Sequence, residues 1–183
     1  MTENPWKTIS QKHIYENPWI KVIENQVINP SGGAGIYGVV HFKHLAVGII
    51  PLDEHYNTWI VGQYRYTLNT YSWEIPEGGG KLDVAPLESA KRELLEETGS
   101  RAEKWTKLLE THTSNSVTDE LGITFIAQNL SFGEAMPDDT EDLKVRKLPF
   151  AELVEMVMRG EITDGFAMSS ILKAKILMDR GEI

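Results

Sequence analysis

The sequence changes from strand-like to helix-like patterning at a run of three glycines, Gly78 to Gly80. Pro86 can occupy the first turn of a helix, because the N–H that it lacks would have no partner there. Leucine and alanine then recur at helical spacing as far as Gly99, a residue type that commonly ends helices. The pattern therefore predicts a strand-rich region, then a glycine loop, then a helix over residues 86–99.

The rest of the chain interleaves both kinds of element. Before the glycines, β-forming residues predict strands over residues 19–24 with an extension at 27–28, 36–42, 45–52, 58–64 and 71–75. After the helix we expect strands near 105–111 and 123–127, and helices over 150–158 and 167–178. This alternation favours α/β or α+β layers around one central sheet, with the β-rich N-terminus as a small appended sheet.

Acidic side chains are concentrated in two segments. The chain has 27 acidic and 18 basic residues and a formal net charge of -9. Eight acids and four bases lie in residues 74–103, five acids and no base lie in residues 134–142, and the remainder is balanced. We expect no nucleic-acid partner, because phosphate backbones are held mainly by Lys and Arg. We also expect the two acidic segments to attract cations.

Several other classes of protein are disfavoured. No apolar run approaches the roughly 20 residues that span a bilayer, and residues 1–10 lack the features of a signal peptide. We therefore expect a cytoplasmic protein without a membrane partner. The absence of cysteine excludes disulfides and thiolate metal sites, and none of the five histidines stands at metal-ligand spacing.

Three glutamates of the expected helix share one face. Glu93, Glu96 and Glu97 are three or four residues apart, so their side chains project together, and Arg92 can partly offset their repulsion. Hard cations such as Mg2+ prefer oxygen ligands of this kind. The alternative is an ordinary solvated acidic face.

This segment resembles the signature of the Nudix hydrolases. The matches stand at the required spacings: Gly78, Arg92, Glu93, Leu94, Glu96, Glu97 and Gly99. Two positions depart, since Val84 replaces the first Glu of the signature and Ser100 replaces an apolar residue.

The resemblance implies a Nudix α/β/α sandwich with a mixed central sheet and an N-terminal antiparallel β extension. The extension would span residues 1–43 and the Nudix hydrolase domain residues 44–183. Glu93 and Glu97 would be ligands of Mg2+ or Mn2+, with Glu96 acting directly or through water and Glu77 offering its main-chain carbonyl. Val84 removes one carboxylate, which predicts weaker or altered metal binding, unless the adjacent Asp83 substitutes.

Motifs outside the signature resemble those of the branch of the Nudix family that hydrolyses ADP-ribose and nucleoside diphosphate sugars. They lie at residues 17–22, 35–40, 63–66 and 73–78. In that branch two subunits exchange their N-terminal strands, so the resemblance implies a homodimer. Trp19 or Tyr37 could stack on a nucleobase, or both could simply pack against the sheet.

Four further residues gain roles from the resemblance. Arg65 would contact phosphate, which suits a guanidinium, although it could also be a surface arginine at a strand end. Glu74 would lie on the substrate side, and Glu120 near the sugar. Glu141 is the first choice for the catalytic base.

The late acidic segment offers two more candidates for that base. Asp139 and Glu134 follow Glu141, since a base carried by a loop can reach the attacking water after substrate binds. Any one of these residues could instead belong to an exposed acidic loop that keeps the protein soluble.

The resemblance thus implies a metal-dependent hydrolase that splits a nucleoside diphosphate sugar or ADP-ribose into a nucleoside monophosphate and a sugar phosphate. Glu141, Glu97 and Glu96 would be its catalytic residues. The alternative is a non-catalytic Nudix module that senses ADP-ribose or nucleotide sugars, which only the departures at Val84 and Ser100 support.

Overall fold

The computed structural model describes residues 3–133 and 143–183. Two compact units make up the chain: Met1–His44 with His112–Glu120, and Leu45–Thr111 with Leu121–Ile183.

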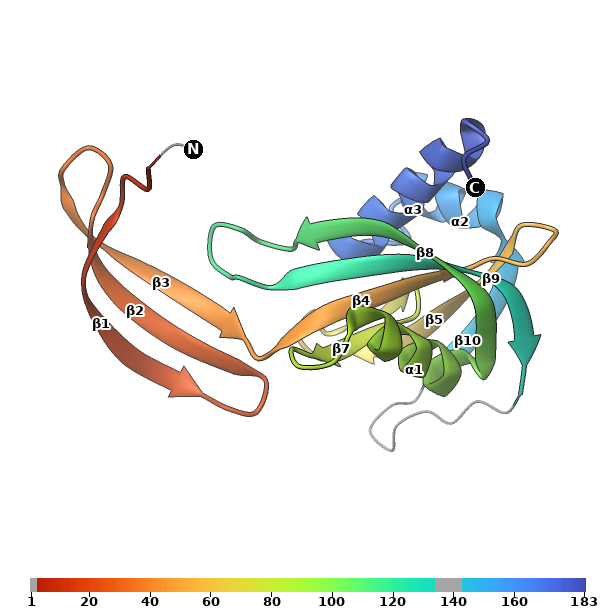
Figure 1. Ribbon diagram of the computed structural model, residues 1–183, viewed down its shortest axis with the longest axis horizontal. Helices are drawn as coiled ribbons and strands as arrows, with labels where there is room; N and C mark the ends of the chain where they lie inside the picture. Colours follow the sequence, from red (N-terminus) through yellow and green to blue (C-terminus); the bar gives the residue numbers. More distant parts are fainter. Residues whose placement is uncertain (1–2, 134–142) are drawn as a thin grey trace. The chain divides into compact units, whose positions relative to one another are not determined.

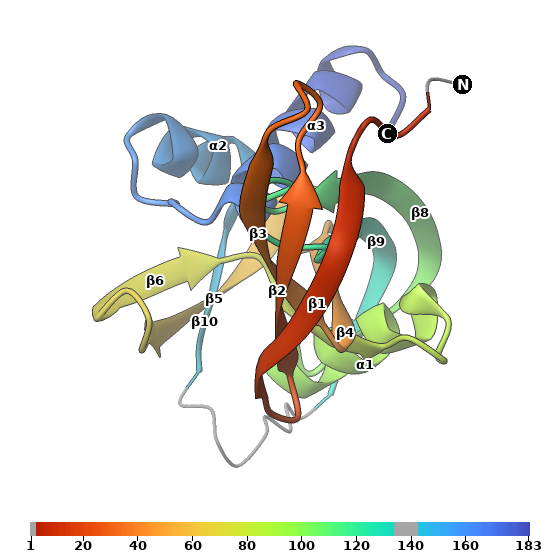
Figure 2. The same ribbon diagram turned by 90° about the vertical axis from the view of Figure 1, so that its left-hand side faces the viewer.

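The first unit is built on a three-stranded antiparallel sheet, ordered β1-β2-β3 (Figure 2). Its strands are β1 (Lys7–Glu16), β2 (Ile20–Ile28) and β3 (Ala34–Phe42). Asn29 closes the β2–β3 turn, because its Oδ1 accepts the N–H groups of Ser31 at 3.0 Å and Gly33 at 2.9 Å. Gly32 has a φ of +86°, a conformation in which a side chain would be strained.

The second unit contains two sheets, ordered β7-β4-β9-β8 and β10-β5-β6. Their strands are β4 (His44–Pro51), β5 (Asn57–Arg65), β6 (Thr70–Glu74), β7 (Glu77–Lys81), β8 (Ser100–His112), β9 (Leu121–Phe132) and β10 (Lys144–Pro149). Strands β4 and β9 are parallel, with Ala46 opposite Gly122, whereas β5 pairs antiparallel with both β6 and β10. The expected mixed sheet is therefore present.

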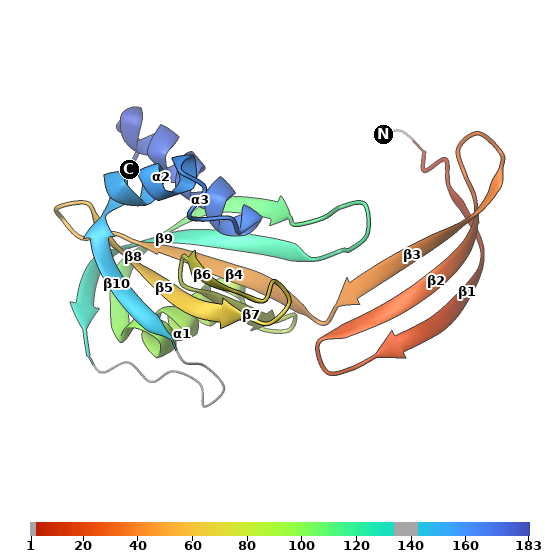
Figure 3. The ribbon, with the colours of Figure 1, turned by 180° about the vertical axis from the view of Figure 1, so that it is seen from behind.

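Helices cover the two sides of these strands (Figures 1 and 3). Helix α1 (Pro86–Thr98) lies on one side, and α2 (Phe150–Met158) and α3 (Gly165–Asp179) lie on the other. Ala90 and Leu94 of α1 are fully buried in a cluster with Val47 and Ile49. The second unit is thus an α/β/α sandwich, as the resemblance implied.

The sequence missed three strands, and each has a physical explanation. Strand β1 is exposed at all ten positions. Because it has no buried face, its sequence need not show the alternation of apolar and polar residues by which strands are recognised. Strand β7 consists of Glu-Gly-Gly-Gly-Lys, and strand β10 is exposed except at Leu148. Their pairing with neighbouring strands, and not their own composition, makes them strands.

Within the ranges 3–133 and 143–183, every helix is too short or too polar to cross a membrane.

Candidate active site

Strand β7 and helix α1 are in direct contact at Gly78 and Gly80. A Cβ at Gly78 would lie 2.3 Å from the carboxyl carbon of Glu93, and one at Gly80 would lie 2.9 Å from Leu45 and 3.0 Å from the hydroxyl of Ser89. Real Cβ atoms do not approach this closely, so glycine is required at Gly78 for the Glu93 carboxylate to lie against the strand.

Helix α1 presents two glutamates to this contact. Glu93 is 8% exposed and Glu97 2% exposed, one turn apart on the helix. Gly99 ends the helix with a φ of +67°, and its N–H donates to Leu95 O at 2.9 Å. The predicted bounds of this helix are confirmed to within one residue.

Arg92 connects the acidic face of the helix to the glycine strand. Its guanidinium donates to Glu93 Oε1 at 2.6 Å, to Glu96 Oε2 at 2.6 Å and to the carbonyl of Gly79 at 2.9 Å. Partial burial acts to lower the pKa of Arg92, but the charges of Glu93 and Glu96 outweigh it and raise that pKa. Arg92 therefore orients both carboxylates while it offsets their repulsion.

Glu97 and Glu77 join the helix to the start of β7. The main-chain N–H of Glu77 donates to Glu97 Oε2 at 3.0 Å. The Glu77 side chain is 14% exposed, and its buried Oε2 has no hydrogen-bond partner among the described residues. Burial, and then the negative charges of Asp164 and Glu74, raise the pKa of Glu77 well above its usual range.

Arg65 lies between Glu74 and Glu77. Its Nε donates to Glu74 Oε1 at 3.0 Å and Oε2 at 3.1 Å, and its Nη2 donates to Glu74 Oε2 and to Glu77 Oε1, the latter at 3.2 Å. Burial acts to lower the pKa of Arg65, whereas the hydrogen bonds and charge of Glu74 raise it. The structure thus brings Arg65, Glu74, Glu77 and Glu97 into one network.

The donor set fits a hard divalent cation. Glu93 and Glu97 supply buried carboxylates, and the buried side-chain Oε2 of Glu77, distinct from the main-chain carbonyl expected as a ligand, is a further oxygen that is unpaired within the described part of the chain. Mg2+ prefers such oxygen ligands. Over residues 3–133 and 143–183, no three acidic or histidine side chains already form a metal-binding group. Because Arg92 donates to Glu93, a bound cation would compete with Arg92 for that carboxylate.

The two departures from the signature lie at opposite ends of α1. Val84 is 39% exposed in the β7–α1 turn, and Asp83 beside it is also exposed. Ser100 follows the helix, is fully buried, and its hydroxyl has no partner among the described residues. Ser100 therefore places an unsatisfied polar group where the signature has an apolar one.

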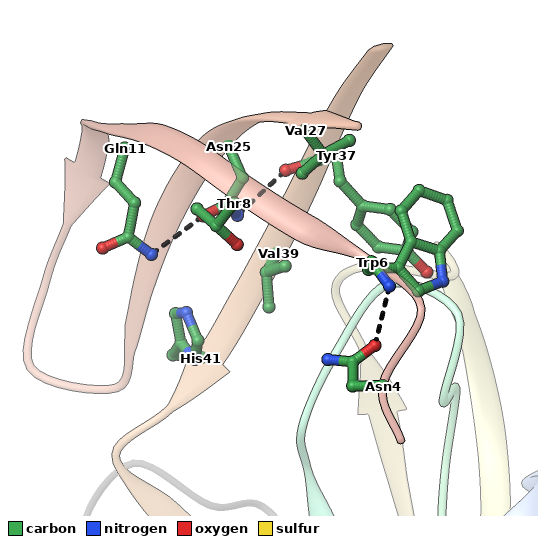
Figure 4. Close-up of a pocket in the computed structure, with 9 residues that line it drawn as sticks. All are labelled: Asn4, Trp6, Thr8, Gln11, Asn25, Val27, Tyr37, Val39 and His41. Atoms are coloured by element: carbon green, nitrogen blue, oxygen red, sulfur yellow. Dashed lines mark hydrogen bonds between the residues drawn. The ribbon is translucent and has the colours of Figure 1, made fainter. Parts of the chain in front are cut away.

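Tyr37 lies at a hollow in the first unit. The hollow has a volume of about 350 Å3, and Trp6, Asn25, Tyr37 and His41 are among its lining residues (Figure 4). Trp6 meets the ring of Tyr37 edge-on at 5.3 Å between centroids, and the Tyr37 hydroxyl donates to Ser116 O at 2.7 Å. Trp19 does not line this hollow and is 65% exposed.

Glu120 also belongs to the first unit, where its Oε2 accepts the hydroxyl of Thr113 at 2.6 Å. The three candidates for the catalytic base, Glu141, Asp139 and Glu134, lie outside the described residues.

Sequence reasoning missed Asp164. Its Oδ1 accepts the N–H of Ala167 at 2.6 Å and caps α3, and its charge acts on both Glu77 and Arg65. Because the helix was expected to start at residue 167, an Asp three residues earlier could have been recognised as its N-cap.

Comparisons with known proteins agree with this geometry. Residues 42–165 match the model of the NUDIX domain, and residues 6–40 match that of the nucleoside diphosphate sugar hydrolase N-terminal domain. An ADP-ribose pyrophosphatase of Mycobacterium tuberculosis is 34% identical over 94% of this chain and 84% of its own length. An ADP-ribose pyrophosphatase of Bacillus subtilis is 31% identical over 86% of each chain.

A solved structure described as an ADP compounds hydrolase superposes with a TM-score of 0.87 over the full length of both chains. It is 18% identical to this chain and therefore supports the fold alone. The NUDIX match covers most of the sequence and includes every buried glutamate of the site described above. This chain is a member of the Nudix family.

Proposed function

We propose that this protein is a divalent-metal-dependent hydrolase that cleaves the pyrophosphate bond of ADP-ribose or of a nucleoside diphosphate sugar. The products would be a nucleoside monophosphate and a sugar phosphate. The observation that carries the proposal is the Glu93 carboxylate packed against Gly78, one helical turn from the buried Glu97. The names of the two bacterial relatives and of the N-terminal family model support this substrate class.

Glu93 and Glu97, with the main-chain carbonyl of Glu77, would hold Mg2+ or Mn2+, and Glu96 would act directly or through water. When bound, such cations neutralise phosphate charge and lower the pKa of a bound water. Arg92 keeps Glu93 and Glu96 in place. Glu141 is our choice for the base that takes a proton from the attacking water.

Tyr37 is one candidate for stacking on the nucleobase. Tyr37 offers an aromatic ring beside Trp6, and the polar side chains around the hollow in Figure 4 could hydrogen-bond a base. Trp19 is an exposed second candidate for stacking, and Glu120 is assigned to the sugar side.

A homodimer accounts for the apolar exposure of β1. Ile9 is 64% exposed, Ile14 48% and Tyr15 52%, so this strand presents a surface that a second subunit would cover. We place the protein in the cytoplasm, as the sequence predicts.

The proposal is tested by incubating the protein with Mg2+ or Mn2+ and a panel of ADP-ribose, GDP-mannose and UDP-glucose. Release of AMP from ADP-ribose, or of the matching monophosphate from a sugar nucleotide, is the expected result, and EDTA should abolish it. Tight binding of the panel without product would instead identify a sensing module.

A variant of Glu97 tests the assignment of the metal ligands. Glu97→Gln should reduce kcat by about three orders of magnitude, because metal ions supply several kcal/mol to such reactions. Glu88→Gln is the matched control, since Glu88 lies on the same helix and pairs at the surface with Lys91. Wild-type turnover by Glu97→Gln would refute the assignment.

A further inference from the structure

Arg65 and Glu74 stand on the two strands of the β5–β6 hairpin (Figure 3), and their side chains are hydrogen-bonded to each other. Arg65 is opposite Thr70, and Glu74 is opposite Val61, so the two charged residues are four positions apart along the hairpin. Side chains at even spacing share a face, and four positions correspond to roughly 13 Å. Only a long side chain extended along the strand can span most of that distance, and arginine is such a side chain.

The resulting contact leaves one nitrogen of Arg65 available. Nε and Nη2 donate to Glu74, and Nη2 also donates to Glu77, whereas Nη1 makes no hydrogen bond to the described residues. The Arg65 side chain is 35% exposed and Glu74 is 3% exposed. The carboxylate is thus the buried partner, and the arginine side chain remains partly exposed.

We propose that Glu74 is a positioning residue that fixes the guanidinium of Arg65, so that Nη1 is held ready to donate to a phosphate oxygen of the substrate. This inference rests on the proposed function, because it concerns the same diphosphate. A guanidinium that is already oriented loses less conformational entropy when it binds phosphate. Glu74 itself does not touch the substrate in this role.

This role requires arginine at position 65 and glutamate at position 74. Lysine at position 65 would lack the second nitrogen needed to bind Glu74 and phosphate together. Aspartate at position 74 would keep the charge, but it is one methylene shorter and would no longer reach the guanidinium. The alternative role of Glu74 is to stabilise the fold alone, although buried ion pairs often contribute little to stability.

The test is a double-mutant cycle on the affinity for ADP, measured by calorimetry in EDTA so that no metal contributes. Glu74→Gln should weaken ADP binding about tenfold, since a hydrogen bond to a charged group is worth about that factor. In an Arg65→Ala background, Glu74→Gln should have no further effect. Unchanged affinity in Glu74→Gln, or effects that multiply in the double variant, would overturn the proposal.

Kinetics with Mg2+ give the second readout. Glu74→Gln should raise KM about tenfold with kcat nearly unchanged, as expected when an interaction equal in ground and transition states is lost. Glu74→Asp should behave in the same way and serves if Glu74→Gln does not fold. Glu103→Gln, an exposed acid on β8, is the control for a change in net charge. If the wild-type protein hydrolysed none of the substrates, that result would count against the proposed function. The double-mutant cycle on ADP affinity tests the positioning role of Glu74 independently of hydrolysis.

Discussion

Substitution of Gly78 by alanine should disable the site while the fold is retained. The added Cβ would lie 2.3 Å from the carboxyl carbon of Glu93 and 2.5 Å from both of its oxygens. Ordinary van der Waals contact begins near 3.4 Å, so the carboxylate must move by about 1 Å. A displacement of that size at a catalytic group can cost about 100-fold in rate.

The movement also has a structural consequence. Glu93 accepts a hydrogen bond from Arg92, which in turn holds Glu96 and the carbonyl of Gly79. Because the displaced atoms are the end of a flexible side chain, the fold should lose only about 1 kcal/mol in the free energy of unfolding, mainly from the weakened hydrogen bonds to Arg92.

The assay is kcat/KM for the preferred substrate with Mg2+, accompanied by thermal unfolding. Gly165→Ala is the matched control, because a Cβ there meets nothing within 4 Å and the residue begins helix α3. The control should keep wild-type kcat/KM. If Gly78→Ala folds and retains kcat/KM within threefold of the wild type, the packing of Glu93 on this glycine does not position a catalytic group.

Three other substitutions test the remaining features. Ser100→Ala should raise the free energy of unfolding by about 1 kcal/mol in urea titrations, because it removes a buried hydroxyl without a partner among the described residues. Ser170→Ala is its control and should be destabilising, since that hydroxyl bonds Phe166 O and Thr124; equal effects would refute the reasoning. Burial acts to raise the pKa of Asp53, but hydrogen bonds from Asn57, Lys147 and the N–H of His55 lower that pKa strongly. The stabilisation by Asp53 is therefore complete above its ordinary pKa of 3.8 and is lost as the pH falls toward the lowered pKa of the folded state. Asp53→Asn should therefore lose about 1–2 kcal/mol at pH 7 and about half as much at pH 2.5, and a loss independent of pH would contradict this account. Gly99→Ala should cost about 1 kcal/mol in urea titrations because its φ is +67°, and an unchanged midpoint would contradict it.

The fold was predictable wherever periodicity and packing agree. Helices α1 and α2 lie where the sequence predicts them, because each carries an apolar face that is buried in the structure. Strand β7 could not be predicted, since three of its five residues are glycines and its conformation depends on pairing with β4. Strand β9 was predicted too short, because its last residues are polar or exposed.

The sequence predicts which residues belong to the site, but it does not predict most of the contacts between them. Spacing alone predicts that Glu93, Glu96 and Glu97 share a face. It does not predict that the main-chain N–H of Glu77 binds Glu97 or that Arg65 reaches Glu74, because both contacts join different elements. Such contacts follow from strand register, which requires the tertiary structure.

The parallel pairing of β4 with β9 has a consequence for the kinetics of folding. Ala46 is opposite Gly122, and β5, β6, β7, α1 and β8 all lie in the chain between them. Contacts this distant in sequence close slowly, because the entropy of a long loop must be lost before the pairing is formed. Helix α1 packs in one buried cluster with Val47 of β4 and Ile123 of β9, so we expect its glutamates to be fully ordered only after this late closure. During refolding, recovery of metal binding should therefore coincide with formation of the whole sheet.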